Sequence, residues 1–152
     1  MPEFVVGSGV EHIRVEVLRR EWPAADDYWD GNWLASRVAV RIGPWIGAYD
    51  AMFRAEDFVR FRESVEAMHR DLDGSARFFT MEPFLSIDLK IDAHGRVSVE
   101  GDAKPEGAGR VFGEVGLDFQ LSDFIDQSFL PALIAQLREI ESAFPVKGDP
   151  SS

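Results

Sequence analysis

The chain has 152 residues, the size of one domain, and 45% of them are hydrophobic, which is enough for a sizeable core. The chain has 16 lysines and arginines and 27 aspartates and glutamates, which gives a net charge of −11. This charge disfavours binding to nucleic acid and anionic membranes and favours binding to a basic partner, unless it serves solubility alone. The absence of cysteine excludes disulfides and thiolate zinc sites; together with an N-terminus that lacks a signal-peptide pattern, it favours a cytoplasmic protein.

Three strands are predicted in the first third of the chain. Residues 12–20 and 37–42 alternate apolar and polar side chains, which is the pattern of a strand with one buried face. Gly43 and Pro44 interrupt this pattern, and residues 45–53 are expected to return as an antiparallel partner strand.

A helix is predicted over residues 55–72, where apolar residues recur at helical spacing. Two acidic residues in its first turn favour the helix dipole, and Asp73-Gly74 is expected to end it. The expected ion pairs between successive turns are Glu56–Arg60 and Glu66–Arg70.

A second group of strands follows this helix. Residues 84–92 alternate, residues 93–95 form a short hairpin loop, and residues 96–101 return. We expect a polar, mobile loop over 103–110 and a further strand over 113–121.

The last predicted element is a helix over 126–144, with Ser128 as its N-cap and Pro131 in its first turn. The tail 148–152 is expected to fray. We therefore predict one α+β domain over residues 1–147, in which a mainly antiparallel β-sheet packs with two α-helices that lie on its faces.

The sequence holds no convincing catalytic or cofactor motif. Gly7-x-Gly9 resembles the start of a dinucleotide fingerprint, but a strand follows where that motif needs a helix. No nucleophile elbow or P-loop is present. The three histidines, His12, His69 and His94, share no metal-ligand spacing. The serines Ser36, Ser86 and Ser98 are expected on the polar faces of strands and suggest no nucleophile. We predict no enzyme, no cofactor and no metal centre.

Residues 24–40 combine aspartates with aromatic side chains. The aspartates, Asp26, Asp27 and Asp30, lack the order of a calcium-binding loop, which leaves a weak cation site or an acidic rim as the alternatives. We expect Trp33 and Trp45 in the core. Tyr28 and Trp29 are expected to be partly exposed, as aromatic residues in protein interfaces are.

Three segments together resemble the WapI-type family of bacterial immunity proteins. They are "DYWDGNWL" (27–34), "MEPFLSIDL" (81–89) and "DQSFLPALIAQLREIESAFPV" (126–146). The order and spacing of these segments are similar to those of the family over nearly the whole chain. Phe84 departs from the pattern, which has a polar residue such as asparagine after Glu-Pro.

The resemblance implies a small cytosolic partner of a polymorphic toxin, which binds and blocks the C-terminal domain of that toxin. Such toxins are often nucleases with a basic phosphate site, which an acidic inhibitor can cover. We therefore predict a non-catalytic immunity protein; the predicted partner-binding residues are Asp26, Asp27, Tyr28, Trp29 and Asp30, with Glu82 and Asp126 as family-matched positions. The alternative is a self-associating structural or regulatory domain, which forms a homodimer through exposed strand edges.

Overall fold

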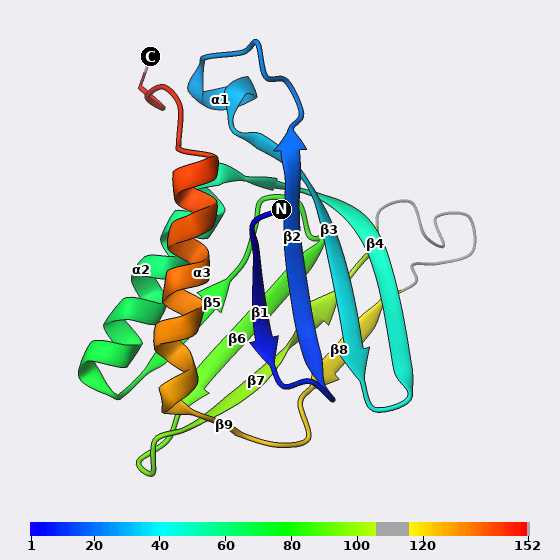
Figure 1. Ribbon diagram of the computed structural model, residues 1–152, viewed down its shortest axis with the longest axis vertical. Helices are drawn as coiled ribbons and strands as arrows, with labels where there is room; N and C mark the ends of the chain where they lie inside the picture. Colours follow the sequence, from blue (N-terminus) through cyan, green and yellow to red (C-terminus); the bar gives the residue numbers. More distant parts are fainter. Residues whose placement is uncertain (106–115, 152) are drawn as a thin grey trace.

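Two antiparallel sheets and two long helices make up the fold in the computed structural model, which describes residues 1–105 and 116–151 (Figure 1). The strands are β1 (Glu3–Gly7), β2 (His12–Arg20), β3 (Trp33–Ile42), β4 (Trp45–Arg54), β5 (Ser75–Phe78), β6 (Leu85–Ile91), β7 (Arg96–Ala103), β8 (Leu117–Gln120) and β9 (Ile125–Asp126). The helices are α1 (Tyr28–Gly31), α2 (Ala55–Asp71) and α3 (Leu130–Ala143), with a 3₁₀ turn at Gln127–Phe129 before α3.

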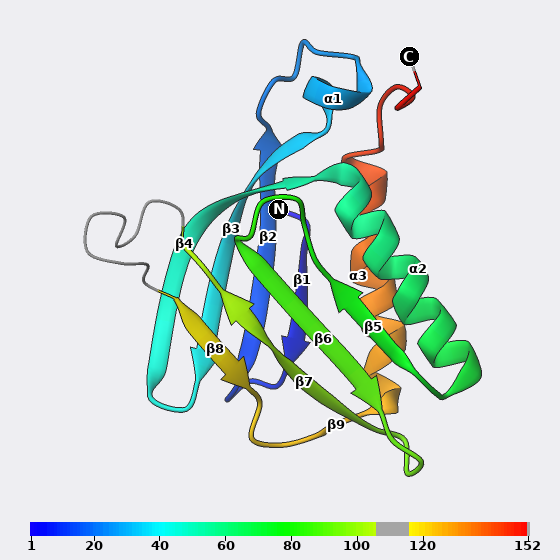
Figure 2. The ribbon, with the colours of Figure 1, turned by 180° about the vertical axis from the view of Figure 1, so that it is seen from behind.

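The strands form two sheets that share one hydrophobic core. The first sheet has the order β1-β2-β3-β4, and the second has the order β5-β6-β7-β8, with β9 also paired to β7. Every pairing is antiparallel. The strands of one sheet cross those of the other (Figures 1 and 2), and the core cluster takes side chains from both. The predicted α+β class with mainly antiparallel pairing is confirmed.

The helices lie side by side along one flank of the two sheets, where α2 contacts β5 and α3 contacts β1 (Figure 2). We expected each helix on the face of a sheet. The helices instead close the side between the edge strands β1 and β5, because their apolar stripes meet the core that the two sheets enclose.

Phenylalanine rings fill the core where the helices meet the sheets. The rings of Phe4, Phe53, Phe58, Phe61 and Phe78 contact one another with centroid separations between 5.3 and 6.1 Å, most of them edge-on. Aromatic pairs prefer this geometry and gain about 0.5–1.5 kcal/mol each beyond burial. Strands β1, β4 and β5 are thus fixed to α2.

Helix α2 begins at Ala55 as predicted, but the ion pair in its first turn and its last residue differ from the expectation. Arg60 pairs with Asp57 at 2.5 Å and not with Glu56, because Asp57 caps the helix from its third position. The chain leaves α2 through Leu72, which adopts the left-handed region with a φ of 50°, so the helix ends at Asp71, one residue short of the predicted range 55–72.

The second expected ion pair was also wrong, and its replacement joins the two helices. Glu66 pairs with Arg62 at 3.0 Å and with Arg138 at 2.5 Å, in place of Arg70. Arg62 also reaches Glu141 on α3 at 2.7 Å. The pair Arg62–Glu66 lies within α2 at a spacing of four residues, whereas the pairs with Arg138 and Glu141 depend on the proximity of the two helices, which sequence spacing does not report.

Three side-chain predictions need correction. Ser128 is not an N-cap, because Asp126 caps the 3₁₀ turn before α3 and its carboxylate accepts a hydrogen bond from the N–H of Ser128 at 2.8 Å. Ser36 is buried, and its hydroxyl donates a hydrogen bond to the carbonyl of Leu34 at 3.2 Å. Trp45 is 65% exposed, because the first half of β4 extends beyond the core.

The sequence pattern did not predict the short strands β1, β5 and β9 or the helix α1. Of the expected loop 103–110 and strand 113–121, residues 106–115 lie outside the described residues. In the described parts of the chain, no helix has both the length and the apolar character that crossing a membrane requires.

Candidate partner-binding surfaces

The predicted partner-binding segment 26–30 lies in the connection between β2 and β3, at one end of the molecule (Figure 1). We call residues 21–32 the α1 cap. Glu82 is exposed in the turn before β6, and Asp126 lies in β9. Because β9 and α1 are at opposite ends of the molecule in both views, the structure does not bring Asp126 to the other predicted residues (Figures 1 and 2).

The helix α1 is set by local hydrogen bonds. The carboxylate of Asp27 accepts a hydrogen bond from the N–H of Asp30 at 3.0 Å, as an N-cap aspartate does. The N–H of Gly31 donates to the carbonyl of Asp27 at 2.9 Å. A Cβ on Gly31 would lie 2.8 Å from the carbonyl oxygen of Ala25, so this close approach of the chain requires glycine.

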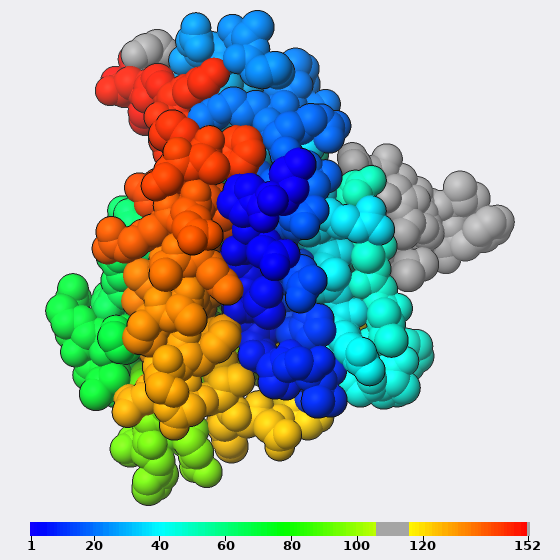
Figure 3. All heavy atoms as spheres, in the orientation of Figure 1, coloured from blue at the N-terminus to red at the C-terminus, as the bar shows by residue number. Residues whose placement is uncertain are grey.

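The buried side chain of Asn32 joins the α1 cap to the C-terminal segment. Its Nδ2 donates to the carbonyls of Tyr28 and Lys147, both at 2.9 Å, and its Oδ1 accepts from the N–H of Lys147 at 2.8 Å. The Lys147 ammonium then donates to the carbonyls of Pro23 at 3.2 Å and Ala25 at 3.0 Å. The C-terminal residues therefore lie against the cap, which Figure 3 shows on the surface.

The guanidinium of Arg54, only 3% exposed, supports the cap from the side of the core. It donates to the carbonyls of Trp29 at 2.7 Å and Tyr28 at 2.6 Å, and its Nε donates to the carboxylate of Glu56. The rings of Tyr28, Trp29 and Trp33 lie 5.1, 5.7 and 5.0 Å from its central carbon, within the range of cation–π attraction. One buried cation thus fixes both the backbone and the aromatic side chains of α1.

The outer surface of the α1 cap is aromatic and acidic. Trp22 and Trp29 are 50% and 51% exposed, and the ring of Trp29 packs edge-on against Tyr28 at 5.1 Å. The side chain of Asp26 is 92% exposed, and Asp30 is exposed as well. Sequence reasoning missed Trp22, although a tryptophan two residues after a predicted strand and directly before a proline is a signal for a loop aromatic.

Two groups beside the cap, the Tyr28 hydroxyl and the Asp57 carboxyl, have raised pKa values. Burial raises the pKa of the Tyr28 hydroxyl, and the negative charge of Glu56 raises it further. Burial also raises the pKa of Asp57 to about 6, against the opposing effect of the Arg54 N–H and of Arg60.

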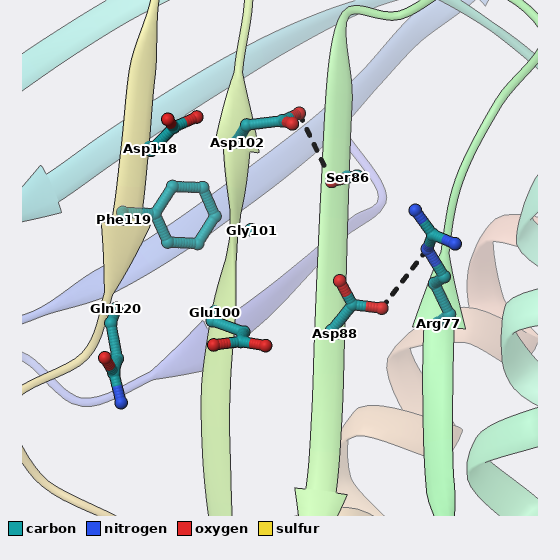
Figure 4. A pocket seen from close by; sticks show the side chains of 9 residues that line it. All are labelled: Arg77, Ser86, Asp88, Glu100, Gly101, Asp102, Asp118, Phe119 and Gln120. Carbon is teal, nitrogen blue, oxygen red and sulfur yellow. Dashed lines mark hydrogen bonds and ion pairs between the residues drawn. The ribbon is translucent and has the colours of Figure 1, made fainter.

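A second acidic surface, which we call the acidic face, covers the outer side of the second sheet (Figure 4). Its carboxylates are Asp88, Glu100, Asp102 and Asp118. The strand register places Asp88 directly opposite Glu100, and Asp102 directly opposite Asp118. Like charges in these positions destabilise a sheet. The sequence gives no sign of this surface, because the residues come together only through the pairing of β6, β7 and β8.

Few positive charges balance the acidic face. Among the described residues that line its depression of about 470 Å³, Arg77 pairs with Asp88 at 3.2 Å, and the hydroxyl of Ser86 donates to Asp102 at 3.2 Å. Across the described residues, the acidic face included, no three metal-binding side chains gather into a site for an ion. The arrangement is chemically suited to attract the basic side chains of a partner.

Comparison with known proteins identifies the family. The model of the immunity protein WapI-like family matches residues 4–145. No curated protein and no solved structure gives a significant match. The match covers both sheets, both long helices and the α1 cap, and the chain therefore belongs to the immunity protein WapI-like family.

Proposed function

We propose that this chain is a non-catalytic immunity protein, which binds the toxic domain of a cognate bacterial toxin and blocks it through the α1 cap. The observation that carries this proposal is the exposed pair Trp22 and Trp29 beside Asp26 and Asp30, on a cap that hydrogen bonds hold in place. Family membership supports the neutralising role.

The geometry of the cap favours tight binding. Because Arg54, Asn32 and Lys147 already fix the backbone of the cap, little conformational entropy is lost when a partner docks. Tryptophans that become fully desolvated are the commonest energetic anchors of interfaces. Carboxylates around them suit a partner with a basic surface, and the net charge of −11 accelerates the encounter.

The chemistry of the partner follows from this charge. A toxin that acts on nucleic acid carries a basic site for phosphate, so we propose a nuclease-type toxin domain as the partner. The same proposal has the protein act in the cytoplasm, which its lack of cysteine fits.

The test is co-expression with the C-terminal domain of the toxin encoded beside this gene. We expect a stable complex and survival of the host. The Trp29→Ala variant and the double variant Asp26→Lys/Asp30→Lys should each weaken the complex at least about tenfold. The double variant Glu63→Lys/Glu139→Lys, at exposed positions on α2 and α3, changes the net charge by the same amount and is the matched control. The absence of both complex and protection would overturn the immunity role, and full binding by Asp26→Lys/Asp30→Lys would remove the cap from the interface.

Self-association is the alternative function. No described strand pairs with the outer edges of β4 and β8, and such edges are able to pair between copies. Light scattering that finds an obligate dimer without a toxin partner would favour this alternative.

A further inference from the structure

An apolar groove lies between the first half of β4 and the adjoining ends of β7 and β8. It has a volume of about 440 Å³. Its apolar lining includes Val40, Trp45, Ile46, Tyr49, Ala103 and Leu117. Strand β4 ends the first sheet and β8 ends the main path of the second, so the groove lies between two edge strands.

Two large apolar side chains of the groove are exposed. Trp45 and Ile46 are 65% and 74% exposed. Large side chains that are exposed together mark interaction sites more often than chance. Tyr49 has its hydroxyl already engaged by the carbonyl of Phe84 at 2.5 Å, and burial raises the pKa of that hydroxyl. The Tyr49 hydroxyl thus needs no hydrogen bond from a ligand, and the groove offers mainly apolar contact.

The groove adjoins the acidic face. Ala103 and Leu117 are directly opposite each other on β7 and β8, and the next pair along the same strands is Asp102 and Asp118. Because successive residues of a strand point to opposite faces, Ala103 and Leu117 line the groove, whereas Asp102 and Asp118 lie on the outer face of the same two strands. A segment along the edge of β8 would therefore place alternate side chains in the groove and over the carboxylates. Lys104 is a nearby cation, with its stem close to the backbone at the start of β8.

We propose that the groove and the acidic face together form a docking surface for an extended basic segment of a partner protein. One apolar side chain of the segment packs in the groove against Trp45, and lysine or arginine side chains reach Asp102 and Asp118. The edge strands favour an extended segment, since no strand among the described residues pairs with the outer edges of β4 and β8. This surface is separate from the α1 cap and does not depend on where a toxin binds.

The test uses a strand-length synthetic peptide of alternating lysine and valine, with a glutamate–valine peptide as its charge-reversed control. In amide NMR spectra of the full chain, the lysine peptide is expected to shift the Trp45 indole signal and the amides of β4 and β8. The glutamate peptide should shift none of them. Shifts confined to the α1 cap, shifts spread evenly over the surface, or no shifts at all would each overturn the proposal.

Two variants separate specific docking from general attraction to an acidic protein. Trp45→Ser should weaken peptide binding about tenfold, since it removes the apolar anchor. Asp118→Asn should weaken binding and also reduce its dependence on salt, while relief of the repulsion with Asp102 keeps the sheet folded. Glu63→Gln removes the same charge from the exposed surface of α2. Equal binding by Asp118→Asn and Glu63→Gln, or unchanged binding by Trp45→Ser, would refute the proposal.

Discussion

Replacement of Arg54 tests whether one buried cation holds the α1 cap. Its guanidinium is 3% exposed and donates to two carbonyls of α1 and to Glu56, whose side chain is only 13% exposed. Arg54→Met keeps the apolar stem but leaves two carbonyls and a buried carboxylate without their donor. Removal of one partner from a buried ion pair costs about 3–5 kcal/mol, a large part of a total stability of about 5–15 kcal/mol.

Urea unfolding, followed by circular dichroism and tryptophan fluorescence, measures this loss. Arg54→Lys should lose less than Arg54→Met, because it keeps the charge but not the planar fork that reaches two carbonyls. The double variant Arg54→Met/Glu56→Gln should recover part of the loss, since it removes the unpaired carboxylate. A loss below about 0.5 kcal/mol for Arg54→Met would refute this account, since that is the range of ordinary surface substitutions.

Three further predictions concern stability. The pKa of Asp57 is raised from 3.8 to about 6 in the folded chain, so its protonated form stabilises the fold, and this stability is lost as the pH rises through both values. Relative to Asp57→Asn, urea titrations should show wild-type stability falling by about 3 kcal/mol as the pH rises from about 3 to about 7, and a constant difference would contradict this. Gly101→Ala should cost at least about 2 kcal/mol in thermal unfolding, because its Cβ would lie 1.9 Å from the carbonyl oxygen of Ser86, whereas Gly47→Ala has open space and should cost little. Lys147→Ala should accelerate amide hydrogen exchange in α1 but not in β6, and equal acceleration in both would show that Lys147 does not act locally on the cap.

Sequence periodicity predicted the long elements of the fold well. The alternation of residues 12–20 and 84–92 and the helical stripe of 55–72 correspond to β2, β6 and α2 within one or two residues. Each of these segments repeats its pattern often enough to be recognised, because one face of it meets the core. Strand β5 has only four residues, too few for a pattern, and it owes its place to pairing with β6.

The candidate site was predicted only in part. The sequence indicated an acidic and aromatic segment at 26–30, and the structure places this segment in the α1 cap. It did not indicate that Arg54 and Lys147 hold the cap, since these residues are 25 and 115 positions away from the groups they contact, Trp29 and Asn32.

The sequence by itself determined the α+β class, the position of the long strands and helices, the strong negative charge and the likeness to an immunity family, because periodicity, composition and motif order are properties of the chain alone. Only the tertiary structure decided where the charge gathers and what is exposed. Strand register brought Asp102 and Asp118 together, and the hairpin that extends beyond the core exposed Trp45. Such contacts depend on the pairing of distant segments, which local sequence patterns do not specify.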